Sequence, residues 1–259
     1  MPSTERVKPQ TSEQVAIGIA KDFTERNFSL SIEGYYKKMT NIIGYKDGAS
    51  FLFLDFGSEG QRTSEVDWQD NVTSGRGKAY GFEFLLQRKT GRLTGWIGYT
   101  LSWIKHQFDD KNEGREYSPR YDHRHDASIV TTYKLNPSIT FSATWVFSSG
   151  DNLTIPIASS FVHGISTSGS GFDGLYRDVS FFGEFNSFQA AAYHRLDLGI
   201  KFHKKKKRGE RTWEIGVYNA YNRINPFFYE SSTDSNQERK LYRQGLFPLI
   251  PSLTYSFKF

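Results

Sequence analysis

The last residues of the chain constrain its fold more than any other segment. Four apolar residues alternate with four polar ones over the final eight positions: Leu253, Tyr255, Phe257 and Phe259 against Ser252, Thr254, Ser256 and Lys258. Successive side chains of a strand face opposite sides, so this segment predicts a strand with one apolar and one hydrated face. A half-buried strand of a soluble protein has this pattern. A bacterial outer-membrane barrel also ends on such a strand, with aromatic residues on its apolar face.

The composition favours the second possibility. The chain has 259 residues and no cysteine, which excludes disulfides and thiolate metal sites. Its hydrophobic content of 37% is low for a packed soluble domain, whereas its aromatic content of 16% is high. No run of 18 apolar residues exists, so the sequence predicts no membrane-spanning helix. A transmembrane barrel fits these observations because only alternate residues of its strands meet lipid.

The same alternation recurs along the chain and predicts about nine strands. They cover 14–23, 26–39, 78–89, 92–107, 121–134, 138–149, 190–203, 211–221 and 246–259. Short turns are expected at Thr24-Glu25, Thr90-Gly91, Asn136-Pro137 and Lys204 to Glu210, and long polar loops at 40–77, 108–120, 150–189 and 222–245. Short periplasmic turns and long extracellular loops are the plan of an outer-membrane barrel. We therefore expect an all-β fold, an antiparallel transmembrane β-barrel segment of nine strands, or of ten if 50–56 pairs into the sheet.

Charged residues recur on the polar faces of these strands and predict a polar network in the barrel lumen. Its members are Glu33, Glu83, Asp122, Arg124, Asp126, Arg195, Asp197, Lys201 and Glu214. On the strand expected over 121–134, Asp122, Arg124 and Asp126 share one face and form an ion-pair ladder. His123 and His125 share the other face, so the imidazoles and carboxylates diverge and no metal site is expected. Arg195 and Asp197 form a lumen salt bridge, since no nucleophile and base accompany them.

Aromatic and basic residues on the long loops are candidates for ligand binding. They are Tyr45, Trp68 and Arg76 on loop 40–77, and Phe161, His163, Phe172, Tyr176 and Arg177 on loop 150–189. Such residues on extracellular loops suit aromatic, anionic or sugar ligands, and packing between loops is the alternative. The net charge of +5 owes much to the run from Lys204 to Arg208. That run is expected to be a hairpin turn near anionic head groups, because no aromatic residues interleave it to stack nucleic-acid bases.

Several segments resemble barrel strands of TonB-dependent outer-membrane receptors, and they occur in that family's order. These segments are 78–87, 90–102, 120–126, 193–198, 218–227 and 247–259. Proteins of that family have a 22-stranded barrel, an N-terminal plug inside it, and a short box that contacts TonB. The resemblance implies that residues 1–13 are a lead-in loop and that residues 14–259 are the C-terminal part of the barrel. On this interpretation the signal peptide, the plug and the N-terminal strands are absent from the chain.

The function that the resemblance implies is energised uptake of a scarce nutrient across the Gram-negative outer membrane. The chain would supply barrel wall and extracellular ligand-binding loops, with a siderophore or other metal chelate as the first-choice substrate. No catalytic residue and no cofactor is expected. The implied partners are outer-membrane lipid, the missing plug and strands, TonB only through that plug, a surface lipoprotein, and the barrel assembly machinery. That machinery would recognise Tyr255, Phe257 and Phe259 as a C-terminal signal, and no nucleic acid is involved.

Three alternatives stay open at the level of sequence. One is a self-contained barrel of eight or ten strands that acts as a small porin or adhesin. Another is a membrane-embedded hydrolase that uses Ser148 with His106 or His163, although no spacing supports such a site. The last is a soluble β-sandwich with lectin-like loops. The sequence does not separate ferric siderophores from cobalamin, other chelates, peptides or glycans.

Overall fold

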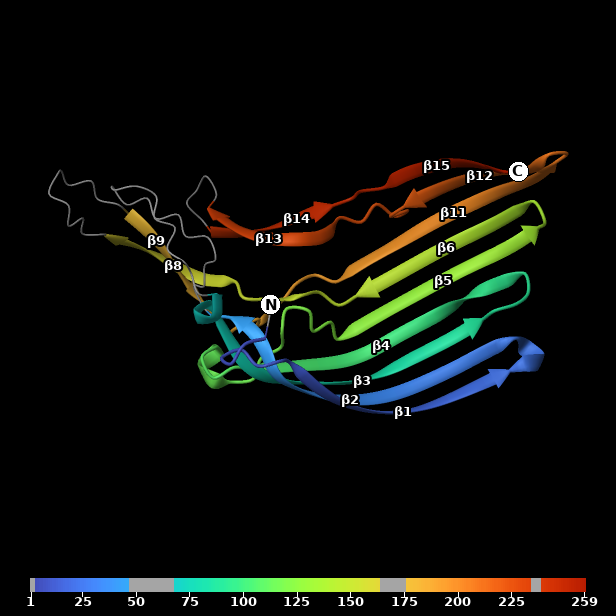
Figure 1. Ribbon diagram of the computed structural model, residues 1–259. Coiled ribbons are helices and arrows are strands. Elements are labelled where there is room, and N and C mark those ends of the chain that lie inside the picture. The colour runs from blue at the N-terminus through green and yellow to red at the C-terminus, as the bar shows by residue number, and fades with distance from the viewer. Residues whose placement is uncertain (1–2, 47–67, 164–175, 234–238) are drawn as a thin grey trace.

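One large antiparallel sheet dominates the structure (Figure 1). The computed structural model describes residues 3–46, 68–163, 176–233 and 239–259. The sheet contains nine strands in the order in which they occur along the chain. They are β1 (Thr11–Phe23), β2 (Phe28–Tyr45), β3 (Val72–Arg88), β4 (Leu93–Gln107), β5 (His125–Asn136), β6 (Ile139–Ser148), β11 (Tyr193–Lys206), β12 (Gly209–Tyr218) and β15 (Ile250–Lys258). The all-β prediction and its nine strands are confirmed.

Three small two-stranded sheets lie in the longer connections. They pair β7 (Asn152–Leu153) with β10 (Phe188–Gln189), β8 (Pro156–His163) with β9 (Tyr176–Phe182), and β13 (Asn225–Thr233) with β14 (Arg239–Leu246). Single 3₁₀ turns occur at η1 (Thr24–Arg26), η2 (Trp68–Asn71) and η3 (Asn112–Gly114). None of the helices in the described ranges has the length and apolar character needed to cross a membrane. The expected loops 150–189 and 222–245 therefore contain hairpins, while the candidate tenth strand at 50–56 lies outside the described residues.

Several strand boundaries differ by a few residues from those expected, among them the starts of β11 at Tyr193 and β15 at Ile250, and two differences have identifiable reasons. The β2–β3 ladder continues past its expected end as far as Tyr45 opposite Val72, after a bulge between Thr40 and Ile42. Glycines at 75 and 77 hide this extension because they carry no side chain to alternate. The strand expected from 121 begins only at His125, because the preceding residues turn and bury the side chain of Asp122. That strand start was wrong.

The connections at one end of the sheet are short, as expected. Figure 1 shows the four hairpin turns at the end where the C-terminus lies, and the small sheets at the opposite end. In the turn between β5 and β6, Oδ1 of Asn136 accepts the backbone N–H groups of Ser138 (2.8 Å) and Ile139 (2.9 Å). We call the two ends the short-turn end and the loop end.

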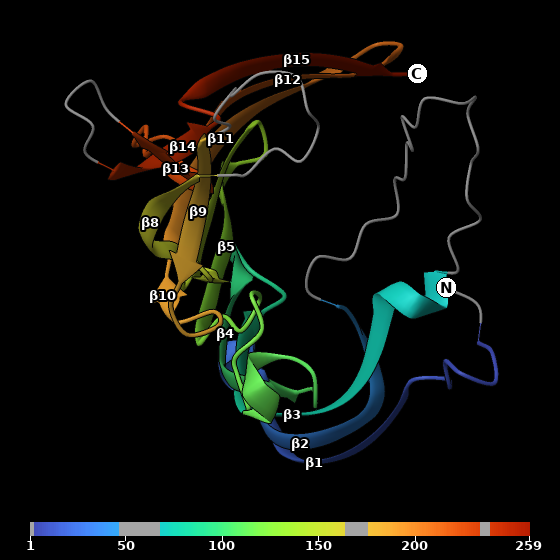
Figure 2. The same cartoon turned by 90° about the vertical axis from the view of Figure 1, so that its left-hand side faces the viewer.

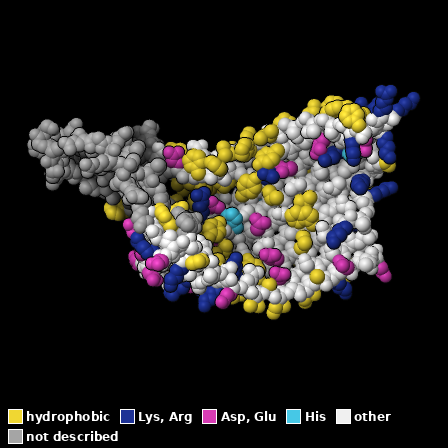
Figure 3. Space-filling view, viewed as in Figure 1, with side chains coloured by type: hydrophobic (Ala, Val, Ile, Leu, Met, Phe, Trp, Pro, Cys, Tyr) yellow, Lys and Arg dark blue, Asp and Glu magenta, His cyan; other side chains and the backbone are white. Residues whose placement is uncertain are grey.

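The two faces of the sheet differ in polarity. Cross-strand register aligns apolar side chains on one face, as in the row Ile32, Phe84 and Tyr99. These side chains are exposed; Ile17 is 78% and Leu253 67% accessible. The sheet curves (Figure 2), and Figure 3 looks into its concave face, where acidic side chains line the hollow together with scattered hydrophobic ones. The convex face is therefore apolar and the concave face polar, the inverse of a soluble fold.

Among the described residues, a cluster of buried apolar side chains occurs at the loop end. Ile42, Phe108 and Tyr117 form the buried cluster there, with Met39 and Phe185 packed against it. Over the described residues, β1 pairs only with β2 and β15 only with β12, so the sheet is an open curved wall. The hydrogen-bond ladder, and not a core, holds the greater part of this wall together.

Replacement of Gly95 by alanine is expected to weaken the β4–β5 pair. Gly95 has a φ of +148°, and a Cβ atom there would lie 2.0 Å from the carbonyl oxygen of Val130. Gly95→Ala should lower the free energy of unfolding by at least about 1 kcal/mol. Gly98→Ala is the control on the same strand, because its Cβ would meet only the ring of Trp96, at 3.1 Å. Urea unfolding in detergent micelles measures both variants, and equal midpoints would contradict the account.

Candidate functional site

A cavity of about 530 Å³ lies at the loop end, beside the ends of β5, β6 and β11 and the β13–β14 hairpin. Its polar lining consists of Arg120, His123, Asp126, Ser148, Ser149, Asp151, Thr154, Tyr193, Tyr229 and Ser231. Its apolar lining includes Leu153, Ile155, Pro156, Pro226, Phe227, Phe228 and Leu241. We call this space the loop-end cavity. Aromatic walls with a few fixed polar groups are the usual construction of a small-molecule site.

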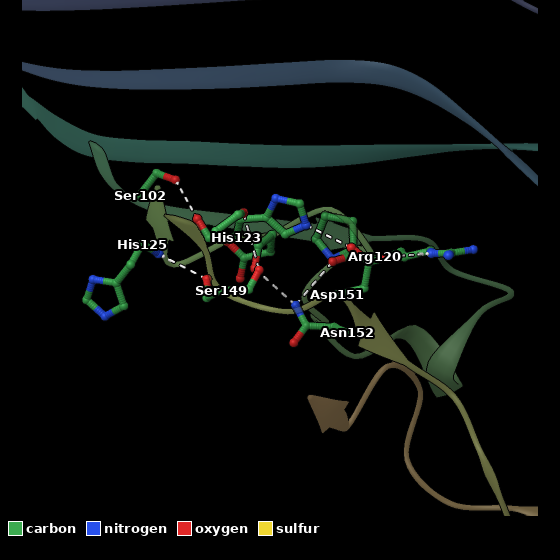
Figure 4. Close-up of polar contacts among 10 residues, drawn as sticks. Ser102, Arg120, His123, His125, Ser149, Asp151 and Asn152 are labelled. Atoms are coloured by element: carbon green, nitrogen blue, oxygen red, sulfur yellow. Dashed lines mark hydrogen bonds and ion pairs between the residues drawn. The ribbon is translucent and has the colours of Figure 1, made fainter. Parts of the chain in front are cut away.

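Asp151 organises the polar side of the loop-end cavity (Figure 4). Nε of Arg120 donates a hydrogen bond to its Oδ2 at 2.8 Å, and Nε2 of His123 lies 2.8 Å from its Oδ1. The neighbouring Asn152 donates from Nδ2 to the carbonyls of Pro119 (3.3 Å) and Asp122 (3.2 Å). The segment after β6 is thereby fastened to the segment before β5, and a cation and an imidazole are fixed at the cavity wall.

Opposing influences act on the pKa of Asp151. Partial burial raises this pKa, but hydrogen bonds from His123 and Arg120, together with the charge of Arg120, outweigh burial and lower it below the ordinary value. The carboxylate is therefore ionised at neutral pH. It accepts a hydrogen bond from Nε of Arg120, and the side chain of Arg120 remains 61% exposed. An exposed guanidinium in this position can contact an anionic ligand.

Asp122 has a structural role that the ion-pair ladder did not anticipate. The residue is only 2% exposed; its Oδ1 accepts the backbone N–H of Ile104 (2.9 Å) and its Oδ2 accepts a hydrogen bond from Arg124 (3.1 Å). The guanidinium of Arg124 also lies 4.8 Å from the ring of Trp103. Asp122 and Arg124 precede β5, whereas Asp126 lies within it and pairs with neither. The three-residue ladder along one strand was therefore wrong, and a single Asp–Arg pair replaces it.

The two histidines of this segment also separate. His123 approaches Asp151, while Nδ1 of His125 lies 2.8 Å from Oη of Tyr99. Figure 4 shows the two imidazoles directed apart. In the described part of the chain no group of three or more His, Asp or Glu side chains is close enough to hold a metal ion.

A second Asp–Arg pair supports the end of β11. Arg195 donates from Nε to Asp197 (3.0 Å) and from Nη1 to the hydroxyls of Tyr193 (2.9 Å) and Tyr218 (2.6 Å). Oδ1 of Asp197 accepts the backbone N–H of Asn219 at 2.9 Å, and Asn219 is fully buried. All three guanidinium nitrogens of Arg195 thus have partners among neighbouring side chains. The hydrogen bond from Arg195 therefore holds Tyr193 at the cavity wall.

The remaining charges of the expected lumen network fall into two groups. Lys201 and Glu214 form an ion pair across β11 and β12 at 2.9 Å. Glu33 lies directly opposite Glu83, which lies opposite Thr100, which in turn lies opposite Asp126. We call Glu33, Glu83 and Asp126 the carboxylate row. In the portion of the chain that is described, no cation pairs with any of the three. Like charges in adjacent positions are unfavourable, so the described contacts leave the repulsion between Glu33 and Glu83 uncompensated.

The structure does not gather the loop candidates into one site. Tyr45 ends β2, Trp68 begins η2, and Arg76 donates from Nε to Oε1 of Gln107 (2.9 Å) on the convex face. The β8–β9 ladder carries Phe161 and His163 on one strand and Tyr176 and Arg177 on the other, with His163 opposite Tyr176. Phe172 lies outside the described residues. Tyr45, Trp68 and Arg76 do not line the loop-end cavity.

Of the residues that line the cavity, alternation predicted Asp126 as a lumen-facing group but missed Arg120 and Asp151. Arg120 and Asp151 are 31 positions apart, and no local pattern connects them. The three consecutive aromatic residues from Phe227 to Tyr229 were a usable signal, because they stand near the start of the otherwise polar connection 222–245. At the other end of the molecule, Tyr255 packs on Trp213 (ring centroids 4.7 Å apart) and Phe257 on Phe259 (5.1 Å).

The fold defines the class of this protein. An antiparallel wall with an apolar convex face, a polar concave face and segregated turns and loops is part of a transmembrane β-barrel. The family model described as "TonB dependent receptor-like, beta-barrel" matches residues 3–238. The chain belongs to this family, as its segments predicted. The family consists of transport receptors of the Gram-negative outer membrane, and not of enzymes.

Solved structures of low sequence identity share the fold. The pyoverdine outer membrane receptor FpvA of Pseudomonas aeruginosa PAO1 is 12% identical, with a TM-score of 0.55 over 98% of this chain and 30% of that one. The ferric citrate transporter FecA is 13% identical, with a TM-score of 0.54 over 97% and 32%. The ferric-catecholate import receptor Fiu of E. coli K12 is 15% identical, with a TM-score of 0.53 over 97% and 28%. The chain thus spans about 30% of their length. A search of curated protein sequences gave no match.

Removal of the Asp122 carboxylate is expected to destabilise the loop end. Asp122→Ala leaves the Arg124 guanidinium without its partner and the N–H of Ile104 without its acceptor, at a cost of about 3 kcal/mol. Asp126→Ala is the matched control, because the described residues give Asp126 no ion pair, and it should change stability by less than about 0.5 kcal/mol. Urea unfolding in detergent micelles compares the two. Equal losses would show that Asp122 does not act through its buried contacts.

The contacts of Asp151 should depend on pH in one direction. Its pKa is lower in the folded chain than in an unfolded one, so its contribution to stability is complete above the ordinary aspartate pKa of about 3.9 and disappears as pH falls through the lowered value. Partial exposure limits this contribution to about 1 kcal/mol. Hydrogen exchange of the Asn152 and Ala190 amides reports it.

At pH 7 the Asp151→Asn variant should exchange these amides several-fold faster than the wild type. The difference should vanish in acid, where both side chains are neutral. Asp109→Asn, which changes an exposed carboxylate, is the control. A difference that persists unchanged below the titration range would rule out the charge of Asp151 as the cause.

Proposed function

We propose that this chain forms barrel wall and ligand-binding rim of an outer-membrane receptor for energised uptake of a scarce nutrient, with ferric and other metal chelates as the ligand class. The loop-end cavity carries the proposal. Its volume of about 530 Å³ falls within the usual range of small-molecule sites, roughly 300–1,000 Å³. It combines one exposed guanidinium, one imidazole and several aromatic walls.

The chemistry of the cavity suits an anionic, partly aromatic ligand. Arg120 offers charge-assisted hydrogen bonds, and Tyr193 is fixed by its bond to Arg195. Phe227 and Phe228 pack edge to face at 5.9 Å and remain exposed, so they can contact planar ligand groups. Metal chelates with carboxylate or catecholate groups combine these properties. The names of the similar structures supply consistent support, since they describe ferric citrate, ferric catecholate and pyoverdine ligands for those proteins.

The wall itself implies further partners. Unpaired backbone groups in lipid cost several kcal/mol each, so β1 and β15 need neighbouring strands on their open edges. We place residues 14–259 in the wall of a larger closed barrel in the outer membrane, with residues 1–13 leading into it. The carboxylate row faces the lumen and suits a basic segment of a plug, through which TonB would act. Tyr255, Phe257 and Phe259 would present the C-terminal signal to the barrel assembly machinery.

Chelate binding and uptake test this function. The protein, produced from its own gene and extracted in detergent, is titrated with ferric citrate, a ferric catecholate and ferric pyoverdine. At least one should bind, and the Arg120→Gln/His123→Gln variant should bind it at least tenfold more weakly, since charge-assisted hydrogen bonds contribute about 1.5–3 kcal/mol. Arg208→Gln/His203→Gln, at the short-turn end, is the control and should bind like the wild type.

Uptake of radiolabelled iron by cells should disappear without TonB. Absence of binding to every chelate, or equal losses in the two double variants, would refute the assignment of the cavity. Uptake that continues without TonB would refute the energised mechanism while leaving the cavity intact. The binding titration therefore tests the cavity, and the uptake assay tests the dependence on TonB.

A further inference from the structure

Three lysines stand side by side on the convex face near the loop end. Lys38 lies directly opposite Lys78, and Lys78 lies directly opposite Lys105. We call these residues the lysine row. Side chains alternate along a strand, so each lysine shares its face with the residue two positions nearer the short-turn end. Those residues form an aromatic row: Tyr36, Tyr80 and Trp103.

The aromatic row locates the edge of the hydrocarbon layer. Tyr36 and Tyr80 stack with their centroids 6.4 Å apart, and Tyr80 and Trp103 with theirs 5.4 Å apart. Stacked tyrosine and tryptophan on the apolar face of a barrel mark the interface between lipid tails and head groups. Two residues of a strand span about 6.6–6.8 Å, so the lysine row lies one such step further out. That position is the depth of the lipid head groups.

The described residues neutralise the lysine row only in part: Glu13 lies directly opposite Lys38 at the β1 end of the row. Like charges directly opposite one another on a sheet are unfavourable. Lys78 is paired with Glu116 at 2.8 Å, and Lys105 donates to Oγ of Ser118 at 3.0 Å. Lys38 makes no ion pair with any described residue and is exposed. Arg76 adds a further cation on the same face, one step toward the loops.

The lysines also share a depression in the surface. A hollow of about 140 Å³ is bordered by four cations, one carboxylate and one ring of the aromatic row: Lys38, Arg76, Lys78, Lys105, Glu116 and Tyr36. A hollow of this size accommodates a phosphate group with its first contacts. Its cations converge from three adjacent strands, so a single dianion could contact several of them.

We propose that the lysine row binds the phosphate groups of a phosphorylated glycolipid of the outer leaflet, of the lipopolysaccharide type. This inference rests on the proposed function, because it requires the convex face to lie in the outer membrane with the loop end outward. Ammonium groups attract phosphates at a membrane surface, at about 1 kcal/mol each. The aromatic row below would contact the acyl chains of the same lipid. The lipid phosphate then relieves the repulsion within the row.

Retention of the lipid tests the proposal. The protein is produced from its own gene, extracted from membranes in mild detergent, and assayed by native mass spectrometry and binding titration with purified lipopolysaccharide. Lys38→Gln/Lys78→Gln/Lys105→Gln should bind this lipid about a hundredfold more weakly, from three losses of about 1 kcal/mol. Lys38→Gln alone breaks no ion pair and should weaken binding about fivefold without affecting the fold.

The short-turn end offers a matched control. Lys204, Lys206 and Arg211 occupy the same face beyond Phe202 and Trp213, but in the opposite leaflet. Lys204→Gln/Lys206→Gln/Arg211→Gln should retain lipopolysaccharide like the wild type. Unchanged heat-modifiable migration of each variant on a gel shows that it folds. Equal losses in the two triple variants would overturn the proposal, as would a wild type that holds no glycolipid.

Two further arms identify the ligand and separate the two proposals. Millimolar inorganic phosphate should not displace the glycolipid; complete displacement would indicate a general anion site and overturn the lipid assignment. Membrane fractionation and chelate titration are performed on the same preparations. An outer-membrane protein that binds chelate but no glycolipid overturns this inference alone. A protein that fractionates away from the outer membrane overturns both.

Discussion

Pairing of backbone N–H and C=O groups in lipid is the constraint on which this structure depends. Hydrocarbon offers no hydrogen bonds, so each strand must be paired along its membrane-crossing length. The ladder from β1 to β15 meets this requirement without interruption except at single bulges. Because backbone hydrogen bonds hold the sheet together, the side chains need not form a core and can match the environment on each face. Apolar groups such as Ile17 and Leu253 face outward, and charged groups such as Glu33 face the lumen.

Where the ladder ends, two aspartates, Asp122 and Asp197, accept backbone N–H groups that have no strand partner there. Asp122 accepts the N–H of Ile104, and Asp197 accepts the N–H of Asn219, both at 2.9 Å. Each aspartate also pairs with an arginine two positions away, Arg124 or Arg195. A carboxylate can replace a missing strand because it accepts several hydrogen bonds at once, and the adjacent guanidinium offsets the cost of burying its charge. The loop-end cavity lies between these two supports, so its walls are held by polar contacts and not by a hydrophobic core.

The alternation of side chains predicted the nine strands because the two environments of a barrel wall impose a period of two on every strand. It failed where another interaction sets the backbone. Residues 121–124 alternate in charge like a strand, but burial of Asp122 turns them away from the ladder. The cavity was beyond prediction for a different reason: the contacts of Asp151 with Arg120 and His123 join two connections whose paths depend on the whole wall. Among the apolar lining residues, only the consecutive aromatic residues 227–229 gave a local indication of the cavity in the sequence.

The two faces of the wall share one property that concerns their neighbours. The carboxylate row on the concave face and the lysine row on the convex face each place like charges in directly opposed positions, an arrangement that a self-sufficient sheet would avoid. Elsewhere the same wall pairs its charges internally, as Lys201 and Glu214 do at 2.9 Å. Rows of like charge are therefore not a general consequence of the fold. They lie at heights and on faces where a lumen segment and a lipid head group would meet the wall, and their opposite signs match opposite partners. The partners proposed for the two faces would each carry the charge opposite to that of the row they meet.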